Sequence, residues 1–179
     1  MKADNFFSHD LLKYIKLKSI GNMALDIACG KGGASIYLSK IGWKVSAIDI
    51  ERKYKEYFKK YKNINFFNID LEENIEDYIK KTPFNKTFEL IIVFRYLHRP
   101  LLKKIPTLLK RNGILIYKTF MEGNEIYGRP NSSDYLLKKN ELKKLETEQI
   151  KILLFDQGVK LINKQKRMIQ TAVFKKIDF

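Results

Sequence analysis

The sequence predicts an α/β fold in which helices cover a mostly parallel sheet. Apolar runs of strand length alternate with segments of helical spacing along most of the 179 residues, which is the pattern of repeated βαβ units. A glycine-rich turn at residues 30–33 follows the first apolar run, as at the ligand crevice of a parallel sheet. With 45% hydrophobic residues and no internal repeat or linker, residues 1–179 are expected to form a single domain.

The N-terminal half is expected to begin with a helix and to continue with strands and helices in turn. The helix covers residues 8–18, with Ser8 as its N-cap and Leu11, Leu12 and Ile15 on one side. A glycine at the end of a periodic segment supplies a helix stop. The elements that follow are a strand at 23–28, a helix at 33–41 before Gly42, a strand at 44–48, a basic amphipathic helix at 52–61, a strand at 65–69 and a short helix at 75–80.

The C-terminal half continues the alternation and ends in two strands. Residues 90–94 are wholly apolar, as in a strand buried on both faces. Pro100 can occupy the first turn of a helix over 100–109, which stops before a turn at Asn112 and Gly113. The remaining elements are a strand at 114–120, a loop at 121–134, a charged helix near 141–148, and strands near 150–155 and 171–176 that we expect to pair as a hairpin.

The net charge of +15 has two explanations. Clustered Lys and Arg attract nucleic-acid phosphates. However, 29 of the 35 basic residues are Lys and 6 are Arg, and Ile and Asn are also abundant. A bias towards AT-rich codons produces the same composition, and we favour it as the main cause of the charge.

Cysteine, histidine and hydropathy patterns limit the class of protein. Cys29 is the single cysteine, so an internal disulfide is impossible. His9 and His98 are the two histidines, too few for a Cys/His zinc cluster, and no metal is expected. No stretch approaches the roughly 20 apolar residues of a membrane span, and residues 1–10 lack the apolar core of a signal peptide. We therefore expect a cytoplasmic protein without a membrane partner.

The segment ALDIACGKGG at residues 24–33 is the most informative part of the chain. A buried strand carries Asp26 and then turns through Gly30 and Gly32 into a helix, where glycines permit a close backbone approach to a ligand. Ser35 stands where the dinucleotide fingerprint G-x-G-x-x-G needs its last glycine. Because Asp26 would repel a pyrophosphate and attract a cation, the segment favours a cationic amino-acid cofactor over NAD.

Two further acids follow the next strands. Asp49 ends the strand in VSAIDI, where a carboxylate can accept hydrogen bonds from both hydroxyls of a ribose. Asp70 ends the strand in NIDLEE, where it can bind an adenine amino group. Three acids at the ends of strands are a more specific sign of a cofactor site than a pair of glycines.

These segments, with LIIVFRYLHRPLL and GILIYKTF, resemble the successive motifs of class I S-adenosylmethionine-dependent methyltransferases over roughly residues 20–120. The chain is similar in particular to small bacterial single-domain methyltransferases of the tellurite-resistance and ubiquinone-biosynthesis types. The resemblance implies a Rossmann-like three-layer sandwich with a mostly parallel seven-stranded sheet whose last strand is antiparallel. It also implies S-adenosylmethionine as the cofactor.

The resemblance assigns roles to individual residues. Asp26, Gly30 and Gly32 would hold the methionine part of the cofactor, Asp49 the ribose, and Asp70 with Leu71 the adenine. The further cofactor contacts expected are Ala28, Cys29, Ile50 and Phe94. Arg95 and Lys118 depart from the family, in which many members have a small polar and an acidic residue, so substrate contacts are not transferable.

Methyl transfer is an in-line displacement that depends chiefly on alignment, so the catalytic residues are unknown. His98 is the first candidate for a general base because its pKa can lie near neutrality, and Tyr96 is a weaker one. Both can instead pack against or cap the helix that follows. Residues 95–111 contain six Lys or Arg and no acid, which suits an anionic acceptor or a solvated helix face.

Candidate substrate-binding residues flank the proposed site. They are Arg95 and Arg99 beside the catalytic candidates, and Tyr127 and Arg129 in the loop at 121–134, which can cover the cofactor or be a plain surface connection. A small-molecule acceptor is the leading hypothesis, because one domain leaves little room for an appended nucleic-acid module. The alternatives are an RNA methyltransferase, a non-catalytic cofactor-binding module and, more weakly, an NAD-dependent oxidoreductase. The sequence carries no signal for the oligomeric state.

Overall fold

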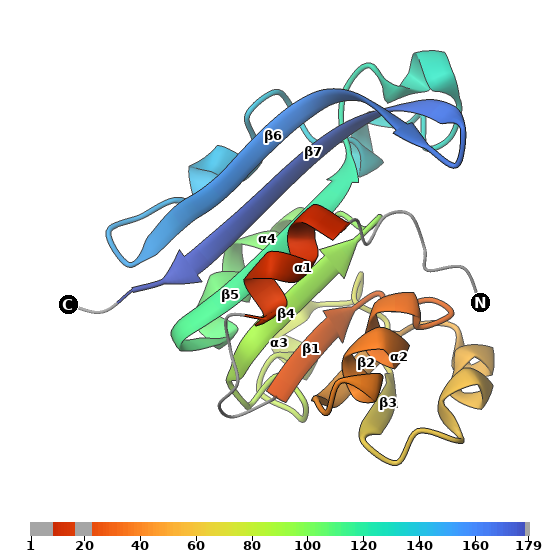
Figure 1. Cartoon of the computed structure of the whole chain (residues 1–179), viewed down its shortest axis with the longest axis vertical. Helices are drawn as coiled ribbons and strands as arrows, with labels where there is room; N and C mark the ends of the chain where they lie inside the picture. The colour runs from red at the N-terminus through yellow and green to blue at the C-terminus, as the bar shows by residue number, and fades with distance from the viewer. Residues whose placement is uncertain (1–8, 17–22, 178–179) are drawn as a thin grey trace.

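A computed structural model describes residues 9–16 and 23–177, which form a seven-stranded sheet with helices on both faces (Figure 1). The strand order is β3-β2-β1-β4-β5-β7-β6. The strands are β1 (Met23–Ile27), β2 (Lys44–Asp49), β3 (Ile64–Asn68), β4 (Phe88–Phe94), β5 (Leu109–Phe120), β6 (Ile150–Ile162) and β7 (Gln165–Lys176). The α-helices are α1 (His9–Lys16), α2 (Gly33–Lys40), α3 (Ile75–Tyr78) and α4 (Arg99–Lys104).

The pairing of the strands confirms the predicted Rossmann-like sheet. Strands β1 to β5 pair in parallel, and β7 pairs antiparallel with both β5 and β6. Strand β1 lies between β2 and β4, so the chain reverses its direction of travel across the sheet after β3. A ligand crevice forms at such a reversal, outside the carboxyl ends of the strands.

Two apolar clusters, one on each face of the sheet, form the core. Alternate residues of a strand point to opposite faces, and in β4 Leu90 and Ile92 join one cluster while Ile91 and Val93 join the other. The first cluster includes side chains of α1 and α2, and the second includes side chains of α3 and α4. These four helices therefore cover the sheet from both sides, as Figure 1 shows.

Three predicted helices are shorter or tighter than expected. Residues 52–61 form the 3-10 helix η1 (Arg52–Phe58), in which Phe58 alone is buried and little apolar packing favours an α-helix. The predicted helix at 100–109 is α4 followed by the 3-10 helix η2 (Ile105–Leu108), because Pro106 lacks the N–H group that an α-helix needs. The charged helix near 141–148 is limited to η5 (Leu142–Leu145).

The late strands are longer than predicted. The turn expected at Asn112 and Gly113 lies inside β5, where Asn112 has a φ of 59° and the register with β4 shifts. Strands β6 and β7 form the expected hairpin, but it extends to a two-residue turn at Asn163 and Lys164. Both turn residues have positive φ, 49° and 65°, as in a type I′ turn that matches the twist of a hairpin.

The predicted loop after β5 contains two 3-10 turns, η3 (Asn124–Tyr127) and η4 (Ser133–Tyr135). The fully buried Asn124 side chain donates hydrogen bonds to the carbonyls of Gly128 and Pro130 and accepts one from the N–H of Met168. These bonds attach the segment to β7. Ser8, the expected N-cap of α1, lies outside the described residues, and every helix within them is too short and polar to span a bilayer.

Candidate functional site

The carboxyl ends of β1 to β4 surround a cavity of about 420 Å³, a size typical of ligand sites. Eight of the residues singled out from the sequence line it: Ala28, Gly30, Asp49, Ile50, Asp70, Leu71, Arg95 and Tyr96. Glu51, Tyr54, Ile69 and Glu72 complete the lining and were not predicted. A repeated pattern in the sequence marks two of these, because Asp-x-Glu follows both β2 and β3.

Backbone conformation explains the glycines of the first loop. Ala28, Gly30 and Gly32 all have positive φ, at 55°, 53° and 76°, a region that disfavours residues with a Cβ atom. A Cβ at Gly32 would also overlap the Cε1 and Cζ atoms of the buried Phe58 ring. Gly32 therefore brings η1 close to the loop, whereas a Cβ at Gly30 would meet no atom within 4 Å.

Asp49 joins the glycine loop to the turn after β2. Its Oδ2 atom accepts a hydrogen bond from the N–H of Gly30 at 2.7 Å, and its Oδ1 atom accepts one from Glu51 at 3.0 Å. The side chain is 8% exposed and lines the cavity. Each carboxylate oxygen has more than one lone pair, so Asp49 retains acceptor capacity for a ligand.

Asp26 lies behind the glycine loop and is not part of the cavity lining. Its Oδ2 atom accepts hydrogen bonds from the N–H of Ser35 at 3.1 Å and from the Ser35 hydroxyl at 2.6 Å. Burial raises the pKa of Asp26 to about 7, although the two bonds from Ser35 lower it. Asp26 thus connects β1 to the first turn of α2 and supports the glycine loop without lining the cavity.

Cys29 and Phe94 also lie outside the lining of this cavity. The N–H of Cys29 donates to the carbonyl of Ile48 at 2.8 Å, and its carbonyl accepts from Gly32 at 2.9 Å. Burial raises the pKa of the Cys29 thiol, which keeps it protonated and unreactive. Phe94 is half-buried and packs with the cluster on the α1 and α2 face.

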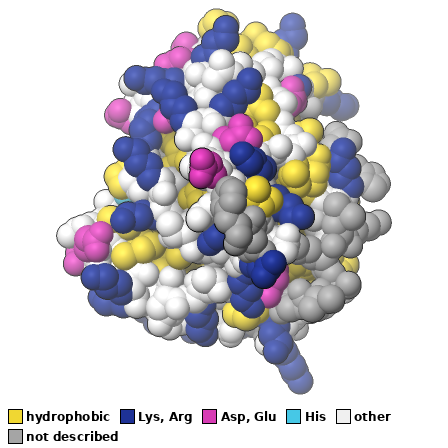
Figure 2. All heavy atoms as spheres, turned by 90° about the vertical axis from the view of Figure 1, so that its left-hand side faces the viewer, with side chains coloured by type: hydrophobic (Ala, Val, Ile, Leu, Met, Phe, Trp, Pro, Cys, Tyr) yellow, Lys and Arg dark blue, Asp and Glu magenta, His cyan; other side chains and the backbone are white. Residues whose placement is uncertain are grey.

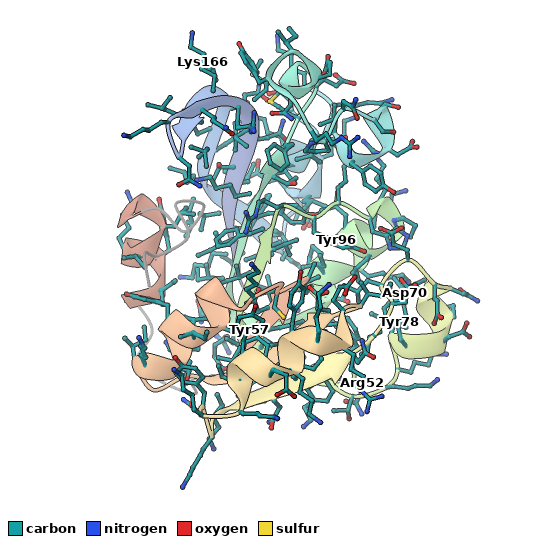
Figure 3. The ribbon with its side chains drawn as sticks, turned by 90° about the vertical axis from the view of Figure 1, so that its right-hand side faces the viewer. Arg52, Tyr57, Asp70, Tyr78, Tyr96 and Lys166 are labelled. Carbon is teal, nitrogen blue, oxygen red and sulfur yellow. The ribbon has the colours of Figure 1, made fainter. Side chains whose placement is uncertain are left out.

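Asp70 and Leu71 form the cavity wall after β3. The Oδ1 atom of Asp70 accepts a hydrogen bond from the N–H of Glu72 at 2.9 Å. The Tyr78 hydroxyl donates to the carbonyl of Leu71 at 3.0 Å. Burial, followed by the charge of Asp70, raises the pKa of Tyr78 to about 12. Figure 3 shows Asp70 and Tyr78 close to Tyr96.

Tyr96 has a buried hydroxyl with no hydrogen-bond partner among the described residues. Burial, followed by the charge of Glu72, raises its pKa. A neutral phenol of this kind can donate or accept a hydrogen bond but is a poor general base. Its backbone is fixed by Tyr117, whose hydroxyl donates to the Tyr96 carbonyl at 2.9 Å. Arg95, which precedes it, is exposed and has a positive φ of 55°.

His98 and Arg99 line a neighbouring cavity of about 250 Å³ rather than the first one. His98 is the N-cap residue of α4 but makes no side-chain capping bond, and its buried Nδ1 atom has no partner among the described residues. Arg99 forms a bidentate pair with Glu141, at 2.8 and 3.1 Å, and donates to the carbonyls of Asp134 and Leu136. Its guanidinium thus holds the segment after β5.

Tyr127 and Arg129 do not line the cavities described above. The carbonyl of Tyr127 accepts a hydrogen bond from Arg167 of β7, and Arg129 is exposed. Pro130 and Tyr135, from the same segment, do line a cavity of about 320 Å³ beside the first one. Among residues 9–16 and 23–177, no group of three His, Cys, Asp or Glu side chains is placed to hold a metal.

A further cavity of about 400 Å³ lies among Lys103, Lys144 and Lys176. Lys176 donates to the carbonyl of Leu109, the first residue of β5, so this cavity is at the opposite end of the sheet. None of the residues singled out from the sequence lines it.

Comparisons with known proteins agree with this arrangement. A family model described as a methyltransferase domain matches residues 24–113, half of the chain. An uncharacterised protein of Schizosaccharomyces pombe is 27% identical, and the match covers 74% of this chain and 50% of that protein. The chain therefore spans half the length of this curated relative.

Two solved structures show the same fold. TehB from Haemophilus influenzae superimposes with a TM-score of 0.75 at 18% identity, over 93% of this chain and 61% of TehB. Magnesium protoporphyrin IX methyltransferase from Synechocystis PCC 6803, solved with bound S-adenosylhomocysteine, has a TM-score of 0.63 at 16% identity over 93% of this chain and 80% of that one. From the family match, the strand order and the loop after β1, the chain belongs to the class I S-adenosylmethionine-dependent methyltransferases.

Proposed function

We propose that this protein transfers the methyl group of S-adenosylmethionine to a small-molecule acceptor. The observation that carries the proposal is the charge of the first cavity. Its lining contains four carboxylates, from Asp49, Glu51, Asp70 and Glu72, and one cation, from Arg95. In a chain with 35 basic and 20 acidic residues, this concentration of negative charge favours a cationic ligand and disfavours the pyrophosphate of NAD.

The cavity residues suit the parts of this cofactor. Asp49 can accept hydrogen bonds from ribose hydroxyls while it holds Gly30 and Glu51 in place. Asp70 and Leu71 would bind the adenine in this proposal, and the loop from Ala28 to Gly32 the methionine part, with Ile50 as a further apolar contact. When bound, the cofactor supplies an electrophilic methyl carbon on a positively charged sulfur.

Asp26, Cys29 and Phe94 support the site indirectly in this proposal. Asp26 acts through Ser35 and the loop, Cys29 acts through its backbone bonds, and Phe94, the last residue of β4, packs against the apolar cluster on the α1 and α2 face. We also propose that residues 1–179 form one domain, since both apolar clusters share a single sheet. The cytoplasmic location expected from the sequence stays a prediction.

Isothermal titration with S-adenosylmethionine, S-adenosylhomocysteine and NAD tests the proposal. We expect the first two to bind and NAD to bind weakly or not at all. Asp49→Asn should weaken cofactor binding by about 1.5–3 kcal/mol, because it replaces a charged acceptor. Asp156→Asn is the matched control, since Asp156 pairs with Lys160 on β6. Preference for NAD, or unchanged affinity in Asp49→Asn, would contradict the assignment.

The charge of +15 keeps an RNA acceptor as a second candidate. On the face in Figure 2, Lys and Arg side chains are scattered among acidic, apolar and uncharged ones and do not form one continuous patch. An RNA methyltransferase should bind RNA with an affinity that falls steeply as the salt concentration rises. A non-catalytic module would instead bind the cofactor without turnover on any acceptor.

A further inference from the structure

A cavity of about 320 Å³, here called the second cavity, lies next to the proposed cofactor site and has the chemistry of a binding site for a cation. The two cavities share Glu72, Arg95 and Tyr96 in their walls. The second is bounded on its other side by Phe120, at the end of β5, and by Tyr135, in η4. A molecule in the second cavity would therefore reach the first across Tyr96.

Three aromatic rings, from Tyr96, Phe120 and Tyr135, line this second cavity. The face of an aromatic ring carries partial negative charge and attracts ammonium groups. Glu72 adds a carboxylate to the same wall. Aromatic rings combined with a carboxylate are a common means of binding an amine or a quaternary ammonium ion.

The Tyr96 hydroxyl is a further polar group beside this cavity. It is buried and has no hydrogen-bond partner among residues 9–16 and 23–177. A buried polar atom without a partner is unfavourable and rare in native proteins. Because the hydroxyl atom itself is covered, a ligand in the adjoining cavity would contact the rest of Tyr96 and would bond the hydroxyl only if the side chain turned.

The wall of this cavity carries one carboxylate, from Glu72, and one guanidinium, from Arg95. After burial, the pKa of Tyr96 is raised by Glu72, then by Tyr78 and Tyr117, and least by Asp70. Glu72 and Arg95 are both exposed to solvent, where screening weakens the effect of each charge. Of the other two cations predicted to bind a substrate, Arg99 is paired with Glu141 and Arg129 lines neither cavity. The site is therefore less suited to an anionic acceptor than the sequence indicated.

We propose that the methyl acceptor is an amine, bound in the cavity between Tyr96, Phe120 and Tyr135 with Glu72 beside its nitrogen. This inference rests on the proposed function. In the reaction, the lone pair of the neutral amine forms the new N–C bond, and the C–S bond breaks with its electron pair going to sulfur. Positive charge moves from sulfur to nitrogen, and the nitrogen then releases a proton to Glu72 or water.

The surroundings favour this charge movement. Carboxylates and ring faces stabilise the positive charge that develops on nitrogen. Acceptors that react as anions, such as thiolates and phenolates, would form their charge beside Glu72 and Asp70, which disfavour it. The wall thus selects against thiol, hydroxyl and carboxylate acceptors.

Three small probes that share a benzene ring test the inference by titration into the whole protein saturated with S-adenosylhomocysteine. The probes are benzyltrimethylammonium, benzyl alcohol and benzenesulfonate. We expect the cation to bind roughly tenfold more tightly than the alcohol and the sulfonate to bind least. A labelled-methyl assay with a panel of primary and secondary amines, thiols and phenols should then give turnover with amines.

Variants distinguish recognition by Glu72 from a general effect of charge. Glu72→Gln should weaken binding of the cation by roughly threefold, as expected for an exposed ion pair, and Tyr135→Ala should have a similar effect. Glu73→Gln is the control, because Glu73 is the adjacent exposed acid and is not part of either cavity wall. Its affinity should match that of the wild type.

The outcomes separate this inference from the proposed function. Binding of S-adenosylhomocysteine together with equal or tighter binding of the sulfonate, no binding of the cation, or equal effects of Glu72→Gln and Glu73→Gln would refute the amine acceptor alone. Turnover only with thiols or phenols would do the same. A protein that fails to bind S-adenosylhomocysteine would overturn both proposals.

Discussion

Substitution of Gly32 by alanine tests the geometry of the cofactor loop through protein stability. The added Cβ atom would overlap two carbons of the Phe58 ring. Phe58 is 4% exposed and stacks on Phe66 at a centroid distance of 5.7 Å, so the ring has little freedom to move. Overpacking of this kind costs about 1–3 kcal/mol. The φ of 76° at Gly32 adds about 1–2 kcal/mol for a residue with a Cβ.

The expected loss for Gly32→Ala is therefore about 2–5 kcal/mol in the free energy of unfolding, measured by urea denaturation. Gly30→Ala is the matched control, because Gly30 also has a positive φ, 53°, but an added Cβ would meet no atom within 4 Å. It should lose about 1–2 kcal/mol. Equal losses in the two variants would show that Phe58 does not restrict this loop.

Three further predictions follow from the contacts around the site. The pKa of Asp26 is raised to about 7 from an ordinary value of 3.8, so the folded state binds more protons than the unfolded state between these pH values. The free energy of unfolding should therefore fall as the pH rises from about 4 to 7. In Asp26→Asn it should fall less over that range. Tyr96→Phe should leave the free energy of unfolding unchanged or raised, because the Tyr96 hydroxyl has no partner among the described residues. Tyr117→Phe should lower it by about 1 kcal/mol, because the hydrogen bond to the Tyr96 carbonyl is lost. A larger loss in Tyr96→Phe than in Tyr117→Phe, measured by urea denaturation, would refute this. Arg99→Lys keeps the charge but loses the bidentate pair with Glu141, so amide hydrogen exchange should quicken over residues 134–141. Unchanged exchange would mean that the pair does not hold this segment.

The fold, and the cavity that we propose as the cofactor site, could be predicted largely from local sequence. Strand β1, the loop after it and helix α2 are adjacent in the chain, and the glycines and strand-end acids there have few alternative explanations when they occur together. The acids after β2 and β3 could be placed at the same edge because parallel strands end at the same side of a sheet. The 3-10 helices η1 and η5 were wrongly expected to be α-helices, since charge and spacing alone do not reveal weak packing.

The surroundings of the candidate acceptor residues were decided by tertiary structure. Arg99 has the charge of a ligand-binding residue in the sequence, but it pairs with Glu141, 42 residues away. Tyr96 and His98 look equivalent as candidates, and only packing shows that Tyr96 lines the first cavity while His98 lies in a neighbouring one. Local patterns determine which strands and turns form, because they depend on residues a few positions apart. Which side chains meet across distant segments depends on how the chain packs, so the pairing of Arg99 and the cavity positions of Tyr96 and Glu72 could be found only from the folded structure.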